Sequence, residues 1–73
     1  MSQTLGQKRV KAEFNPDKSE PVDLIKNKSA ELIDLIETLR TQGCTGEKHR
    51  SISEAQTNIE TGCMYAVKAI FTE

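Results

Sequence analysis

The segment Arg50–Phe71 reads RSISEAQTNIETGCMYAVKAIF and has the periodicity of a long α-helix. Its apolar and small residues recur every three or four positions, the spacing of one helix face: Ile52, Ala55, Ile59, Cys63, Ala66 and Ile70. Gly62 inside this helix costs about 1 kcal/mol relative to alanine, and close contact with another backbone would explain its presence. In so short a chain, the neighbouring helix can come from another copy.

A first long helix is predicted from about Pro21 to Thr41. Ser19 suits the N-cap position and Gly43 suits the C′ position beyond the helix end. The apolar stripe of this helix is wide enough for two neighbouring surfaces: Ile25, Leu32, Ile36 and Leu39, widened by Leu24, Ile33 and Leu35. A short loop, Thr41–Gly46, then makes the two helices antiparallel. The predicted fold class is all-α, an antiparallel helical hairpin.

Residues 1–20 form a polar N-terminal arm in this interpretation, and residues 21–73 form the hairpin, within a single domain. The alternating patch Val10–Phe14, VKAEF, is predicted to form a short strand or an extended arm. The alternative is a frayed tail with one docked aromatic side chain.

A chain of 73 residues is marginally stable alone and usually needs disulfides, a metal or oligomerisation. It has two cysteines, Cys44 and Cys63, but no signal peptide is evident, and Cys63 fits a buried helix position. His49 is the only histidine, so no metal-binding pattern exists. Elimination favours a helical homo-oligomer. No apolar run approaches the length needed to span a membrane.

The formal charge of −1 is unevenly distributed, with a net +2 over residues 1–28 and −3 over residues 29–73. A near-neutral chain is unsuited to general binding of long nucleic acid, which favours a strongly basic face. The near-neutral charge therefore argues against a small nucleic-acid-binding protein that uses the basic N-terminal segment. A few well-placed cations can still bind a small anion.

Catalytic groups are scarce in this sequence. His49 is expected in the exposed first turn of the second helix, and Glu54 and Glu60 are six residues apart, so they do not stack on one helix face. No catalytic residue, metal or cofactor is predicted, and the sequence argues against an enzyme.

Binding chemistry is better represented. Phe14 lies upstream of the cations Lys26 and Lys28, and an aromatic ring with nearby ammonium groups suits a nucleobase and its phosphate. The alternative makes Phe14 a hydrophobic anchor and the lysines a solvated face. A second polar set, consisting of Arg50, Ser53 and Thr57, shares one helix face. This set could bind a shared anion on an oligomer axis, or it could be an exposed helix start.

Several motifs appear in a recognisable order. Phe14-Asn15-Pro16 is followed by Ile25-Lys26, then by R-x-x-S-x-A-x-T-x-I-E over Arg50–Glu60 and M-Y-A-x-K-A-I over Met64–Ile70. Through these motifs, residues 9–71 resemble the phage anti-CBASS type 2 family, small proteins that act as sponges for cyclic oligonucleotides.

The resemblance implies an α-helical protomer that assembles into a compact homohexamer in the host bacterial cytoplasm. It implies that cyclic dinucleotide messengers are held in pockets between paired protomers, which blocks CBASS antiviral signalling. Some members also hold cyclic trinucleotides in separate sites on the threefold axis. Sequestration needs no chemical step, which agrees with the scarcity of catalytic groups.

The resemblance also assigns roles to individual residues. Phe14 matches a base-stacking aromatic that is commonly tyrosine, Asn15 stands where histidine is common, and Lys26, with Lys28 nearby, matches a phosphate-binding position. The region of the trinucleotide site contains Arg50, Ser53 and Thr57. Three residues depart from the family pattern: Tyr65, Lys68 and Phe71. A different interpretation rests on the wide apolar stripes alone, namely a helical protein-interaction module that binds a host protein.

Overall fold

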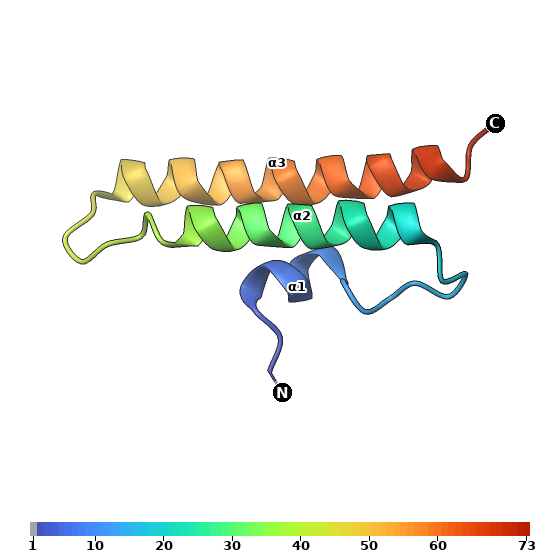
Figure 1. Cartoon of the computed structure of the whole chain (residues 1–73). Helices are drawn as coiled ribbons and strands as arrows, with labels where there is room; N and C mark the ends of the chain where they lie inside the picture. Colours follow the sequence, from blue (N-terminus) through green and yellow to red (C-terminus); the bar gives the residue numbers. More distant parts are fainter. Residues whose placement is uncertain (1) are drawn as a thin grey trace.

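The computed structural model describes residues 2–73 and contains three α-helices (Figure 1). These are α1 (Leu5–Val10), α2 (Glu20–Glu37) and α3 (Gly46–Ile70). The two long helices α2 and α3 lie side by side and antiparallel, and the short α1 packs mainly against α2 (Figure 1). The all-α hairpin is therefore confirmed, while assembly into an oligomer stays a prediction. Met1, the first residue of the predicted arm, lies outside the described residues.

Each helix of the hairpin begins after a capping residue, and the cap of α2 is the predicted one. Ser19 caps α2 and Thr45 caps α3, each through a side-chain oxygen that accepts a hydrogen bond from a backbone N–H of the first turn. Gly43 adopts a left-handed φ of +82° in the connecting loop, which glycine accepts without strain. The predicted end at Thr41 is wrong, because α2 stops at Glu37 and tightens into turns where Thr38 N–H bonds to Leu35 O at 3.1 Å. The C′ position predicted for Gly43 is therefore wrong as well, since Thr38 is the C-cap of α2.

The strand or extended arm predicted for Val10–Phe14 is also wrong. Val10 instead ends α1, and Lys11 follows it in the left-handed region with a φ of 54°. A capping box starts the helix, because Thr4 Oγ1 accepts from Gln7 N–H at 3.1 Å and Gln7 Oε1 accepts from Thr4 N–H at 2.9 Å. Local hydrogen bonding at Thr4 thus outweighs the apolar alternation further along.

A close backbone approach of the kind predicted for Gly62 is found within the chain at Gly6. A Cβ atom added to Gly6 would lie 2.1 Å from the Ala30 carbonyl oxygen, so α1 and α2 touch through their backbones. Asp34 secures this crossing by accepting a hydrogen bond from Gly6 N–H at 2.7 Å. Within residues 2–73, a Cβ on Gly62 would meet no atom within 4 Å. The chain itself therefore gives no packing reason for Gly62.

The core lies where the three helices meet. Its central cluster consists of Val10 from α1, Ala30 and Ile33 from α2, and Cys63 from α3, and Val22 and Ile52 are also buried. Cys63 therefore acts as a small buried hydrophobe, as its helical position predicts. None of the helices in residues 2–73 is long and apolar enough to cross a bilayer.

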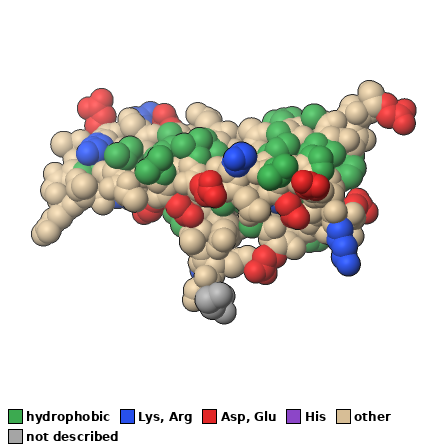
Figure 2. Space-filling view, viewed as in Figure 1, with side chains coloured by type: hydrophobic (Ala, Val, Ile, Leu, Met, Phe, Trp, Pro, Cys, Tyr) green, Lys and Arg blue, Asp and Glu red, His purple; other side chains and the backbone are tan. Residues whose placement is uncertain are grey.

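Large hydrophobic side chains remain exposed outside this core, and Figure 2 shows groups of them along one face of the molecule. On α2, Leu24, Leu32 and Leu35 are exposed over 45–64% of their surface. The molecule is flat, with principal-axis extents of 45 × 30 × 12 Å. The wide stripe of α2 is thus only partly covered by the chain's own helices.

Candidate ligand-binding site

Phe14 lies in the loop that connects α1 to α2, and its side chain is 64% exposed. Lys26 of α2 reaches this loop, and its Nζ atom lies 5.4 Å from the centroid of the Phe14 ring, within cation–π range. The structure therefore brings together Phe14 and Lys26, the aromatic residue and the lysine to which the family resemblance assigns ligand binding. The exposure of the ring argues against the alternative in which Phe14 is a hydrophobic anchor.

Lys26 is a buried residue, with only 7% of its surface exposed. Its ammonium group donates to the backbone oxygens of Lys11 at 3.0 Å and Phe14 at 2.5 Å. Within residues 2–73, two of its three N–H groups therefore have carbonyl acceptors. Lys26 binds the loop that carries Phe14 and places a positive charge beside the aromatic ring.

Asn15 organises the same loop. Its Nδ2 group donates to Ser19 O at 2.7 Å and to Asp23 Oδ1 at 2.9 Å, and its Oδ1 atom accepts from Ser19 N–H at 3.0 Å. Both amide N–H groups of Asn15 are thus engaged inside the protein. The structure supports a positioning role for this residue.

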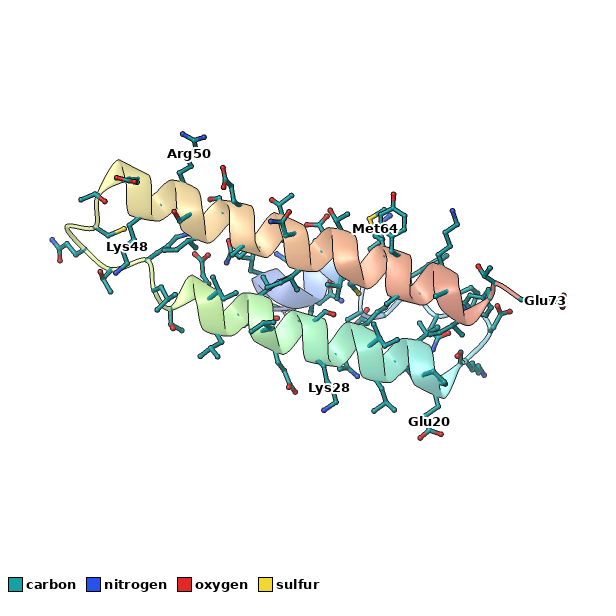
Figure 3. The ribbon with its side chains drawn as sticks, turned by 90° about the horizontal axis from the view of Figure 1, so that it is seen from above. Glu20, Lys28, Lys48, Arg50, Met64 and Glu73 are labelled. Carbon is teal, nitrogen blue, oxygen red and sulfur yellow. The ribbon has the colours of Figure 1, made fainter. Side chains whose placement is uncertain are left out.

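Lys28 does not join the group around Phe14. Two helical residues correspond to a rotation of about 200°, so Lys28 leaves α2 on the side opposite Lys26. Figure 3 shows its side chain pointing away from the helix pair, and the residue is exposed.

Two hollows meet at Lys26. The first, here called the aromatic cavity, measures about 120 Å³ and is lined by Phe14, Asn15, Pro16, Asp17, Val22, Lys26, Val67 and Phe71. The second, the cationic cavity, measures about 580 Å³ and is lined by Arg9, Val10, Lys11, Lys26, Glu60, Cys63, Met64, Val67 and Lys68. Four cations face one carboxylate in the second cavity, so it is suited to an anion.

Sequence reasoning did not select Arg9, Lys11 or Lys68 as site residues. Arg9 and Lys11 fall in the segment interpreted as an arm. Because no helix was predicted there, helix periodicity could not indicate which way their side chains point. Lys68 follows Met64 by four residues in α3, and both line the cationic cavity. Their i, i+4 spacing indicates in the sequence that the two side chains share one helix face.

The second predicted set is only partly brought together. Ser53 and Thr57 line a polar hollow of about 330 Å³ together with Glu54 and Asn58. Arg50 lies outside this lining; its Nε atom is 3.3 Å from Glu54 Oε1, and Figure 3 shows its side chain projecting outward.

Two other arginines donate to these hydroxyls. Arg40 Nη2 lies 2.6 Å from Ser53 Oγ, and Arg9 Nη2 lies 3.2 Å from Thr57 Oγ1. Arg9 also pairs with Glu60 at 2.6 Å, which joins α1 to α3. The hydroxyl row on α3 is therefore bordered by cations from other parts of the chain.

Arg40 is the centre of a polar network at the loop end of the hairpin. It donates to Glu37 Oε1 at 3.0 Å, Gln56 Oε1 at 3.1 Å and His49 O at 3.2 Å. Hydrogen bonds from Gln56 and then from Arg40 lower the pKa of the Glu37 carboxyl. His49 is exposed in the first turns of α3, as predicted, and its Nδ1 atom lies 3.1 Å from Arg40 Nη1.

Comparison with known proteins adds a family to this geometry. The family model of the Acb2/Tad1 hairpin domain matches residues 6–71, which include both long helices and most of α1. Neither a curated protein nor a solved structure matches the chain. The members of this family are phage proteins that sequester cyclic nucleotides without catalysing a reaction. The chain belongs to the Acb2/Tad1 hairpin domain family.

Proposed function

We propose that this protein is a sponge that binds cyclic dinucleotides in the cytoplasm of the phage's host and thereby blocks CBASS defence signalling. The observation that carries the proposal is the exposed Phe14 ring beside a cavity with four cations. A nucleobase requires an aromatic face and a phosphate requires positive charge, and Lys26 lies where the two meet.

Phe14 is suited to stacking because its ring is exposed while its loop is fixed. The bonds from Lys26 to Lys11 O and Phe14 O fix the backbone, and Asn15 fixes the turn that follows. The ring can therefore receive a base without being withdrawn from a core.

The phosphates are assigned to the cationic cavity. Lys11 and Lys68 are exposed there, and Lys26 adds its charge from a buried position where water screens it less. Arg9 is already paired with Glu60 and contributes less. Of the ligand-binding residues predicted from the sequence, this assignment keeps Phe14 and Lys26 and gives Asn15 a positioning role. In place of Lys28, it assigns phosphate binding to Lys11 and Lys68.

The site is proposed to be completed by a second chain, within a homohexamer. The exposed leucines of α2 support this assembly because they leave an apolar surface that the chain does not cover. Sedimentation or light scattering tests it, and a monomer at working concentrations would contradict it.

Calorimetric titration with a panel of cyclic dinucleotides tests the binding itself. Stacking contributes about 1–3 kcal/mol per base, so Phe14→Ala should weaken binding about tenfold while the helical content stays unchanged. Lys68→Ala should also weaken binding, whereas the matched variant Lys28→Ala should not. A folded protein that binds none of these ligands at micromolar concentration would refute the proposal.

A second ligand is proposed for the polar hollow. Its lining contains the Ser53 and Thr57 hydroxyls and the Glu54 carboxylate. The two hydroxyls accept hydrogen bonds from Arg40 and Arg9, and these adjacent cations support an anionic ligand such as a cyclic trinucleotide. Thr57→Val should weaken trinucleotide binding and leave dinucleotide binding unchanged. If a saturating dinucleotide displaced the trinucleotide, the two ligands would share one site and this assignment would be wrong.

A further inference from the structure

We propose that Asp17 makes the aromatic cavity selective for guanine, so that the protein prefers cyclic dinucleotides that contain this base. The inference rests on the proposed function and adds a base preference to it. It starts from the position of Asp17, a residue that lines the aromatic cavity together with Phe14 and Phe71.

The size of the aromatic cavity limits what can enter it. Pockets that enclose a whole small-molecule ligand usually measure at least about 300 Å³, whereas this cavity measures about 120 Å³. It therefore has room for one base of a cyclic dinucleotide. Phe14 and Phe71, exposed over 64% and 57% of their surfaces, offer two aromatic rings to that base.

The polar groups of the cavity differ in their availability. Asn15 uses both amide N–H groups within the loop, and the Lys26 ammonium donates to two carbonyl oxygens. Asp17 is exposed, and no other side chain in residues 2–73 forms an ion pair with it. The group that is free to recognise a base edge is thus a carboxylate, which accepts hydrogen bonds and donates none.

A carboxylate distinguishes among the bases by their donors. Guanine presents two adjacent donors, N1–H and the N2 amino group, which can bond to the two carboxylate oxygens in parallel. Adenine and cytosine place an acceptor nitrogen beside their amino group, and uracil places carbonyl oxygens on both sides of its single N–H. Only guanine can therefore donate hydrogen bonds to both carboxylate oxygens. Each of the other bases would place an acceptor lone pair against one of these oxygens.

The distribution of charge gives the ligand one orientation. Asp17 lies in the aromatic cavity, whereas Lys11 and Lys68 line the cationic cavity on the other side of Lys26. A ligand with its phosphates toward the carboxylate would place like charges together. The phosphates are directed to the cationic cavity, and the base is directed to Asp17.

The experiment compares cyclic diguanylate with cyclic diadenylate by calorimetric titration of the full chain. A good bidentate contact to a base provides a discrimination of about 1–3 kcal/mol, and Asp17 is exposed, so we expect at least about fivefold tighter binding of cyclic diguanylate. Asp17→Asn is the informative variant, because an amide offers one donor and one acceptor and pairs with the edge of adenine. It should abolish or invert the preference.

Glu13→Gln is the matched control, since it removes the same charge from an exposed position of the same loop that does not line the cavity. It should leave the guanine preference unchanged, and circular dichroism should show equal helical content in all variants. Equal affinity for the two ligands, or a guanine preference that survives Asp17→Asn, would overturn the inference while the sponge function stands. Failure to bind either ligand, or any other cyclic dinucleotide, would overturn both.

Discussion

Gly6→Ala is expected to destabilise the fold, although alanine is the better helix former. The new methyl group would lie 2.1 Å from the Ala30 carbonyl oxygen and 2.7 Å from its carbonyl carbon. Both atoms belong to the backbone of α2, so no side chain can rotate away, and α1 must shift. Moving α1 also strains the hydrogen bond between Gly6 N–H and Asp34.

The magnitude follows from two opposing effects. Overpacking costs about 1–3 kcal/mol, and a rigid backbone obstacle favours the upper part of this range. The gain in helix propensity is below about 1 kcal/mol, because Gly6 lies in the first turn. A net loss of about 2 kcal/mol is large against the roughly 4–11 kcal/mol expected for a domain of this length.

Urea denaturation followed by circular dichroism measures this loss. With a slope of about 1 kcal/mol per molar urea for a small domain, the midpoint should fall by about 2 M. Gly62→Ala is the matched control, because a Cβ there meets no atom within 4 Å in residues 2–73. At concentrations where the chain is monomeric, it should raise stability by up to about 1 kcal/mol. An unchanged midpoint for Gly6→Ala, or a larger loss from Gly62→Ala, would refute the reasoning.

Two further predictions concern the network at the loop end. Gln56 is 1% exposed and donates to Ile33 O and Glu37 Oε1. Gln56→Ala should therefore lower the free energy of unfolding, measured by urea denaturation, by about 2–3 kcal/mol. A loss below about 0.5 kcal/mol would contradict this. Because the pKa of Glu37 lies below its ordinary value of 4.5, its carboxylate stabilises the fold above that pH, and the stabilisation declines as the pH falls further. Glu37→Gln should flatten the acid side of a plot of unfolding midpoint against pH; parallel curves for both proteins would exclude this contribution.

The hairpin could be predicted because its signals are local. The three-to-four spacing from Ile52 to Ile70 places one helix, Ser19 marks the start of the other, and Gly43 marks the loop between them. The α1 helix escaped prediction because six residues are too few for apolar periodicity to emerge. Its capping box, Thr4 to Gln7, was the available signal.

The candidate site was predicted in part for a different reason. Family resemblance paired Phe14 with Lys26, but the direction of the Lys26 ammonium depends on the path of the loop. That path turns through left-handed conformations at Lys11 and Lys18, which are not glycines. The arginine beside Ser53 is Arg40 instead of Arg50 because the early end of α2 turns Arg40 toward α3. These contacts of Lys26 and Arg40 depend on tertiary structure, so the spacing of residues in the sequence does not indicate them.

The anchoring of the Phe14 loop by Lys26 has a consequence for binding kinetics. A loop that is ordered only by its ligand reduces the affinity by the conformational entropy lost on binding, about 0.5–1.5 kcal/mol for each immobilised side chain. Here the loop is ordered by folding, through the two carbonyl contacts of Lys26. A preorganised site of this kind can combine rapid capture with slow release, and a protein that acts by stoichiometric retention depends on slow release. In the proposed site, Lys26 would therefore favour long residence of the ligand even before its charge is considered.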